Sequence, residues 1–159
     1  ISMAHVVQDG DFSSFPEIDR HLAVLSGHNM DLIIGGERAC HLTPESPAFS
    51  FAGDLPVRAV LGKGPIIDLN VMVRRGAWRA TLTRYDLEAC HDLQVVNNIA
   101  VIFVSQGKIR CFSENRQILI PSGDAVQIER ADGPVYLQPD GACRIWLVEL
   151  QAVNRTKGP

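Results

Sequence analysis

A repeat of short apolar strands constrains the fold of this chain more than any other feature. Residues 21–61, which begin HLAVLSGHN, are followed about 77 residues later by a similar succession at 98–138, which begins NIAVIFVSQG. In each copy an apolar run ends at a glycine turn, at Gly27 and Gly107, and a hairpin and a further strand follow. The repeat predicts two copies of one small β-unit within the 159 residues.

Runs of β-branched and aliphatic residues alternate with Gly, Pro, Asp and Asn clusters along the chain, and turn signals at a spacing of about 8 to 12 residues are typical of all-β sandwiches and barrels. The segment Ala77 to Asp92 is the one stretch long enough to consider as a helix. We expect an all-β fold with a first half at 1–76, a connector at 77–93 and a second half at 94–159. The expected strands are 1–7, 19–26, 29–34, 38–42, 47–52, 56–61, 66–74, 78–84, 94–104, 107–112, 116–120, 124–129, 134–138 and 142–151.

The composition and charge of the chain disfavour some classes of binding partner. The net charge of -3 and the pI near 5.9 give no basic field, so we expect no nucleic-acid partner and no binding to anionic membranes. No apolar stretch approaches the roughly 18 residues of a membrane span, and the start lacks the basic residues of a signal peptide, so we expect a cytoplasmic protein. The cysteines contain no C-x-x-C pair, which favours free thiols over a zinc or redox site.

Three segments carry a resemblance to a known family. The segments DGDFSSFPEIDRHLAVLSG (9–27) and FAGDLPVRAVLGKGPIIDLNVMVRRG (51–76), together with IPSGDAVQI (120–128), resemble the HutD/Ves family. The resemblance implies an all-β bicupin, in which two cupin-like β-barrel halves of the jelly-roll type pack together. Family members usually have F-P-G-x-D-R where this chain has FPEIDR, so Glu17 stands at a glycine position. The family's N-terminal W-K-N-G-G-G element is absent from these residues and the chain opens on Ile1, so we expect native sequence to precede it.

The resemblance also bears on metal binding. Most enzymatic cupins hold a metal with histidines and a glutamate, and Arg20 falls where that glutamate would lie. The histidine of the second cupin motif falls at Phe49 in the first half and at Val126 in the second. Imidazole or carboxylate is needed to bind Zn, Fe or Mn, whereas a guanidinium repels a cation. We therefore expect neither a metal site nor another cofactor.

Alternation along two expected strands selects the candidate binding residues. Arg20 shares one strand face with Leu22 and Val24, so a barrel interior behind that face would place a cation at an apolar cavity. A buried guanidinium needs a partner, which could be a protein carboxylate or the carboxylate of a ligand. In the strand IIDLNVMVR, Asp68 and Asn70 share a face and would line a wet cavity or meet solvent.

The candidate ligand-binding residues are thus Arg20, Arg58, Asp68 and Asn70, and a structural salt bridge from Asp68 to Arg20 or Arg58 is the alternative. A Ser or Thr nucleophile at Ser13, Ser14 or Thr43 is disfavoured, because the chain has no G-x-S-x-G elbow.

The family resemblance implies a role in bacterial histidine utilisation. HutD-like proteins are thought to act there as regulatory or metabolite-sensing proteins, with formyl- or formimino-glutamate as ligands. Arg20 and Arg58 would suit the carboxylates of such a ligand, and Asn70 would suit its amide.

Three functions stay open, of which we favour the first: a metal-free regulatory protein that binds a small acidic metabolite, a metal-independent isomerase or hydrolase acting on a small carboxylic acid, and a protein-interaction module. The enzyme would need a titrating base, for which Asp68 is the candidate, so no catalytic residue is assigned otherwise. The interaction module would need an exposed apolar patch. The segment QILIPS (117–122) could pair across a homodimer.

Overall fold

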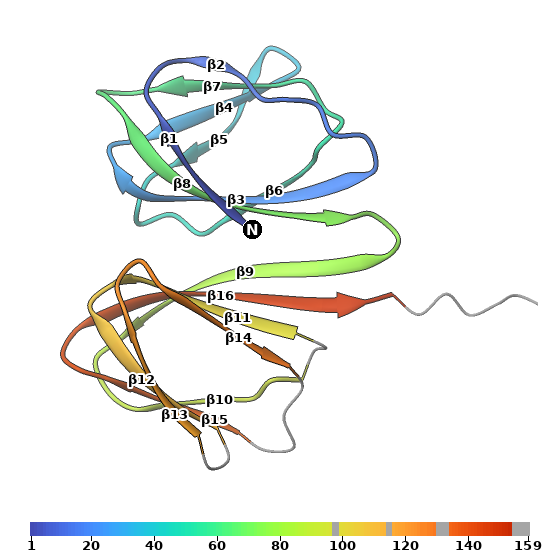
Figure 1. Ribbon diagram of the computed structural model, residues 1–159. Helices are drawn as coiled ribbons and strands as arrows, with labels where there is room; N and C mark the ends of the chain where they lie inside the picture. The colour runs from blue at the N-terminus through green and yellow to red at the C-terminus, as the bar shows by residue number, and fades with distance from the viewer. Residues whose placement is uncertain (97–98, 114–115, 130–133, 154–159) are drawn as a thin grey trace, which may run out of the picture. The chain divides into compact units, whose positions relative to one another are not determined.

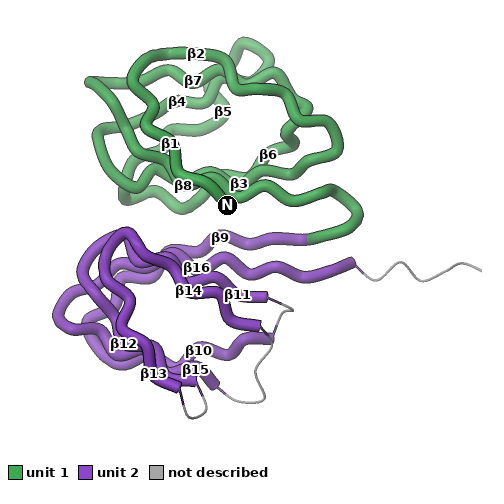
Figure 2. Tube along the Cα trace, viewed as in Figure 1, with its two compact units in different colours: residues 1–78, 155–159 green, residues 79–154 purple. Residues whose placement is uncertain are grey.

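The computed structural model describes residues 1–96, 99–113, 116–129 and 134–153 (Figure 1). This part of the chain consists of strands and turns and contains no helix, so none could cross a membrane. The all-β class expected from the sequence is confirmed. The chain divides into two compact units, residues 1–78 and residues 79–154 (Figure 2).

The first unit contains two four-stranded sheets, in the orders β1-β8-β3-β6 and β2-β7-β4-β5. The pairs within them are antiparallel. Apolar side chains from both sheets meet in one core cluster, in which Leu22, Met30 and Leu32 are fully buried. The strands are β1 (Ser2–Val6), β2 (Gly10–Asp11), β3 (Ile18–Gly27), β4 (Met30–Ile34), β5 (Glu37–Leu42), β6 (Phe49–Ala52), β7 (Val57–Leu61) and β8 (Ile66–Arg74).

The second unit repeats this strand order, eight strands later along the chain. Its sheets run β9-β16-β11-β14 and β10-β15-β12-β13, and a second core cluster includes Ile102, Val104 and Ile109. The repeat read from the sequence is therefore confirmed as a repeat of topology. The strands are β9 (Trp78–Leu87), β10 (His91–Leu93), β11 (Ile99–Gln106), β12 (Lys108–Ser113), β13 (Arg116–Pro121), β14 (Ala125–Glu129), β15 (Val135–Pro139) and β16 (Cys143–Ala152).

Each unit also carries the same irregularity next to its glycine turn. The register of β3 against β8 shifts between Val24 and Ser26, and the register of β11 against β16 shifts between Val104 and Gln106. A bulge bends its strand and increases the local twist, which helps a sheet to curve around a core. The two halves therefore share local backbone features as well as strand order.

Residues 77–93, the expected connector, contain β9 and β10, and the strand predicted at 78–84 lies within β9. Around the buried Leu82, the neighbours Thr81 and Thr83 are exposed, as the alternation of a strand predicts. The β-branched threonines favour this extended conformation. In the expected strand 94–104, residues 97–98 lie outside the described part, and β11 is described from Ile99.

The segment expected at a dimer edge does lie at the edge of a sheet. β13 is the last strand in the order β10-β15-β12-β13, and its Ile118 and Leu119 are each about half exposed. An edge strand offers unpaired backbone groups to another chain. Homodimer formation through this edge stays a prediction.

Candidate functional site

The buried polar residues of the described chain gather at one place. Arg20, Asp68 and Asn70 are 4%, 2% and 8% exposed, and among the described residues no other polar or charged residue is buried. All of them line one cavity of about 460 Å³ in the first unit. Its walls come from β1, β2, β3, β7 and β8 and from the segment between β2 and β3. Three of the four sequence candidates thus meet at one site.

The second unit holds a larger cavity of about 640 Å³, lined by residues that include Cys111, Ile118 and Val126. None of its described lining residues is a buried charged group, since its charged members Arg116 and Glu129 are exposed. Fixed polar groups, and not volume, give a ligand site its specificity. We therefore place the candidate site in the first unit.

Arg20 enters the cavity because of its position on β3. Leu22 and Val24, on the same strand face, belong to the core cluster, so the alternation directs the Arg20 side chain inward. Its guanidinium carbon lies 4.6 Å from the ring centre of Phe12, 5.2 Å from that of Phe51 and 5.8 Å from that of Phe15. Aromatic faces attract a cation and supply part of the stabilisation that water gives in solution.

Hydrogen bonding by Arg20 is sparse. Its Nε–H donates to Asn70 Oδ1 over 3.4 Å, a long contact for a hydrogen bond. A guanidinium has five N–H donors, and no other hydrogen bond or ion pair to Arg20 is formed within the described part of the chain. Burial lowers the pKa of Arg20, and the negative charge of Asp68 partly opposes this effect. The terminal N–H groups are thus available to a ligand or to water.

Asp68 lies on β8 with Val24 opposite it on β3 and Ala4 opposite it on β1. Burial raises the pKa of this carboxyl from 3.8 to about 6, although the Ala4 backbone and the charge of Arg20 lower it in part. Its Oδ1 atom is buried and has no hydrogen-bond partner among the described residues. A buried acceptor without a partner is costly, so Asp68 is poised to accept a donor.

The expected alternative, a salt bridge from Asp68 to Arg20 or Arg58, is not formed among the described residues. Arg58 instead donates from Nη1 to Asp11 over 3.2 Å and is exposed. On β7 the buried neighbours Val57 and Ala59 point inward, so Arg58 points away from the cavity. The structure therefore does not place Arg58 with Arg20, Asp68 and Asn70.

The charged pair at the start of β3, Asp19 and Arg20, divides between the two sides of the strand. Arg20 points into the cavity, whereas Asp19 accepts a hydrogen bond from Arg75 Nε over 2.7 Å. Arg75 also donates to both carboxylate oxygens of Asp54, each over 3.1 Å, and to the backbone oxygen of Ile18. These contacts hold the end of the segment that carries Phe12 and Phe15.

Backbone contacts fix the rest of that segment. Phe12 N–H donates to Val57 O over 2.8 Å, and Phe15 N–H donates to Gly53 O over 2.7 Å. Glu17, at the position where the family usually has glycine, has a φ of 59°, which is in the left-handed region. The sequence did not reveal the contact of Phe12 and Phe15 with Arg20. Their position just before Arg20 in the chain was the available signal.

The site does not suit a cupin-type metal. Its centre is a guanidinium, and Phe49, at one of the expected histidine positions, stacks on Phe51 with ring centres 6.1 Å apart. Within the described residues no three His, Cys, Asp or Glu side chains are grouped so that they could hold a metal ion. The donor set matches an organic acid better than a divalent cation.

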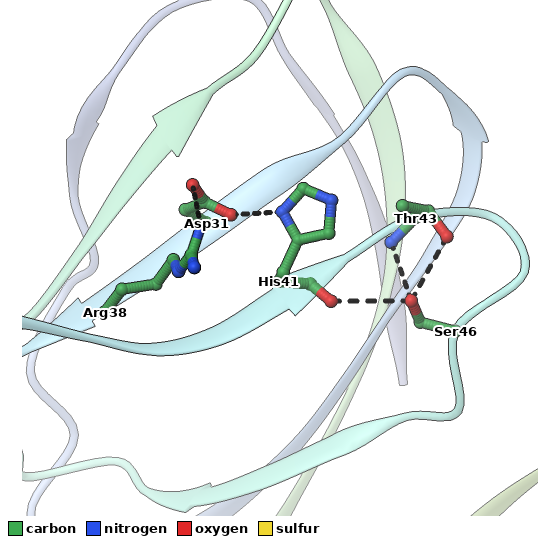
Figure 3. A network of polar contacts seen from close by, with 5 residues as sticks. All are labelled: Asp31, Arg38, His41, Thr43 and Ser46. Atoms are coloured by element: carbon green, nitrogen blue, oxygen red, sulfur yellow. Dashed lines mark hydrogen bonds and ion pairs between the residues drawn. The ribbon is translucent and has the colours of Figure 1, made fainter.

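A second polar network lies on β4, β5 and the turn that follows (Figure 3). His41 Nδ1 and Arg38 Nη1 both contact the carboxylate of Asp31. The Ser46 hydroxyl donates to the backbone oxygen of His41 and accepts from the N–H of Thr43. Because Ser46 contacts the His41 backbone and not the imidazole, this network stabilises a turn and is no Ser-His-Asp triad.

Comparison with known proteins identifies the family. A family model described as HutD matches residues 1–147. The chain belongs to the HutD family.

Curated relatives of this HutD-family chain include two kinds of protein. Protein Ves of Cronobacter sakazakii is 39% identical over 80 residues, which are 50% of this chain and 44% of that protein. Protein Ves of Citrobacter koseri is matched over 41% of its length, so the chain spans less than half of these two relatives. An uncharacterized 21.2 kDa protein in the hutC 3′ region of Pseudomonas putida is 27% identical over 94% of this chain and 77% of that protein.

Solved structures agree with this assignment. A conserved protein of unknown function from Pseudomonas aeruginosa has a TM-score of 0.88 at 25% identity, over 96% of this chain and 82% of that chain. HutD from Pseudomonas fluorescens, determined in a formate condition, has a TM-score of 0.78 at 25% identity, over 96% and 78%. A cupin 2 barrel protein from Leptotrichia buccalis, 9% identical, has a TM-score of 0.58 over 94% and 82% and shows the fold alone. The fold is a bicupin.

Proposed function

We propose that this protein is a metal-free regulatory protein of bacterial histidine utilisation that binds a small acidic metabolite in its first barrel. Formyl- and formimino-glutamate are the ligands we favour. The observation that carries the proposal is the Arg20 guanidinium, which is 4% exposed, surrounded by three aromatic rings, and hydrogen-bonded only to Asn70 among the described residues. An arginine held in this way is prepared to bind a carboxylate with two parallel hydrogen bonds.

Membership of the HutD family supports the link to histidine utilisation, as does the relative in the hutC 3′ region of Pseudomonas putida. The cavity of about 460 Å³ lies within the range of ordinary small-molecule sites. The proposed role would be carried out in the cytoplasm.

Isothermal titration of the full chain with the two glutamate derivatives tests the proposal. Arg20→Met keeps an unbranched side chain among the aromatic rings but removes the charge. We expect this substitution to weaken binding at least about tenfold, because hydrogen bonds to charged groups contribute about 1.5–3 kcal/mol. Arg38→Met, which removes an exposed arginine from the Asp31 network, should bind like the wild type.

Circular dichroism of each variant separates lost binding from lost folding. A folded wild-type protein that binds neither compound, or a folded Arg20→Met variant that binds as the wild type does, would contradict the proposal.

The raised pKa of Asp68 favours one second candidate, a metal-independent enzyme in which this carboxylate acts as general base. Incubating the wild-type protein with each bound compound and following the substrate by mass spectrometry decides between the two. Turnover that Asp68→Asn abolishes while binding persists would establish the enzyme and overturn the purely regulatory role.

A further inference from the structure

Two opposite charges line the proposed ligand cavity without forming an ion pair. Arg20 and Asp68 are both more than nine-tenths buried, and the described residues provide no ion pair for either. Nor do they provide a hydrogen-bond partner for Asp68 Oδ1. Burying both charges without an ion pair costs free energy. A ligand with complementary groups would lower this cost when it binds.

The cross-strand register orders the polar residues along β8. Arg20 lies opposite Met72, Asn70 lies opposite Leu22, and Asp68 lies opposite Val24. Two residues along a strand are about 6.6 Å apart. Arg20, Asn70 and Asp68 thus follow one another in a row along the paired strands, and the Nε–H of Arg20 donates to the middle residue, Asn70.

Other ionisable groups at the cavity make a purely anionic ligand a poor match. Besides Arg20 and Asp68, the lining includes His5 from β1, Asp9, and Asp11 from β2. Asp9 accepts a hydrogen bond from the N–H of Leu61 over 2.8 Å, and Asp11 pairs with Arg58. Among the described residues, three carboxylates and a single guanidinium therefore border the cavity, together with one imidazole.

We propose that the ligand is an ampholyte whose carboxylate binds Arg20 and whose nitrogen-borne donor, an amidine or ammonium group, binds Asp68. This inference rests on the proposed function and narrows its ligand class. The site then selects an amidine over the carbonyl compound of the same shape, because a carbonyl oxygen would face the oxygen of Asp68. Among the two favoured ligands, it selects formimino-glutamate over formyl-glutamate.

Titration of the full chain with N-formimino- and N-formyl-L-glutamate tests this selectivity. At pH 7.5 we expect the wild type to bind the formimino compound at least about tenfold more tightly. Asp68→Asn preserves the shape of the side chain but replaces one acceptor oxygen by a donor, and it should reduce the preference to less than about threefold. At pH 5 the wild-type preference should also shrink, because the pKa of Asp68 is about 6.

Two control variants assign the effect to Asp68. Asp140→Asn removes a carboxylate that pairs with Lys108 in the second unit, and it should leave the preference unchanged. His5→Gln removes the imidazole that also lines the cavity, and the pH effect should persist in this variant.

The possible failures are distinguishable. If the folded wild type binds neither compound, the proposed function fails and this inference fails with it. If both compounds bind through Arg20 with equal affinity, or if Asp68→Asn keeps the wild-type preference, only the ampholyte inference is overturned.

Discussion

Asp68 shows how one buried residue couples stability to pH. The pKa of its carboxyl is about 6 in the folded protein, whereas the ordinary value is 3.8, so the folded state holds its proton more tightly. Between these two values the folded state binds more protons than the unfolded state. Stability from this group is therefore greatest below about pH 4 and falls as the pH rises to about 6.

Asp68→Asn should remove this pH dependence. Relative to the wild type, the unfolding free energy of the variant should increase by up to ~3 kcal/mol between pH 4 and pH 7. Urea unfolding of both proteins at several pH values measures this difference, and the comparison cancels the other titrating groups. A difference that stays constant over the range would show that Asp68 titrates as it does in the unfolded chain.

Glu17 carries backbone strain that a glycine would not. Its φ of 59° costs a residue with a Cβ about 1–2 kcal/mol, and the gain in unfolded-state entropy of a glycine offsets part of this. Glu17→Gly should therefore stabilise the protein by about 1 kcal/mol in denaturant unfolding. Glu17→Ala removes the charge but keeps the Cβ, and it should give no such gain. Equal stabilisation by both variants would assign the effect to charge and not to the backbone.

Alternation along β3 put Arg20 on one strand face with Leu22 and Val24, and the structure places that face toward the core. The same reasoning applied to β7 would have placed Arg58 outward, because Val57, Ala59 and Leu61 form the apolar face of that strand. The strand face on which an arginine lies was therefore a better guide to the site than the fact that the residue is an arginine.

At the scale of elements, one glycine ends an equivalent strand in each unit. A Cβ at Gly27, whose φ is 98°, would lie 2.4 Å from Pro65 O, and a Cβ at Gly107, whose φ is 76°, would lie 2.6 Å from Ala142 O. Both neighbours are backbone atoms and cannot move cheaply. These turns admit only glycine for steric as well as conformational reasons.

Alanine substitutions test this requirement in both repeats. Gly27→Ala and Gly107→Ala should each destabilise the protein by at least about 2 kcal/mol, since conformational strain and overpacking add. Gly141→Ala is the matched control, because Gly141 has a φ of 83° and no atom within 4 Å of a Cβ. It should cost about 1 kcal/mol. Thermal and urea unfolding measure all three, and equal losses would show that the close contacts relax.

The segment 77–93 was long enough to consider as a helix, but a strand was predicted at 78–84, and β9 confirms that strand and extends it to Leu87. Its alanines, leucines and charged residues are compatible with a helix, yet β9 forms because it is the edge partner of β16 in a sheet. Pairing with a strand distant in the sequence outweighs a weak local preference.

At the scale of the whole molecule, each unit of the chain has a core of its own. Leu22 in the first core and Ile102 in the second are both fully buried, and each belongs to a cluster within its own unit. Truncation of either side chain leaves a void in a packed interior.

Leu22→Ala and Ile102→Ala should therefore each lower the unfolding free energy by about 2–5 kcal/mol. Their effects on ligand binding should differ, since Leu22 lies opposite the cavity residue Asn70, whereas Ile102 belongs to the core of the second unit. Titration at a temperature where both variants are folded should show weaker binding for Leu22→Ala and unchanged affinity for Ile102→Ala. Equal weakening by both would mean that the second core contributes to the site.

Local patterns in the sequence were enough to predict the all-β class, the repeat and most strand positions, because strand periodicity and glycine turns are local properties. The arrangement of Phe12, Phe15 and Phe51 around Arg20, and the place of Asp68 in the same cavity without an ion pair, emerge only from the folded chain. These relations depend on the register between strands far apart in the chain and on how far each side chain reaches. Neither quantity is encoded in any single stretch of residues, so the chemistry of the site became visible only in the folded barrel.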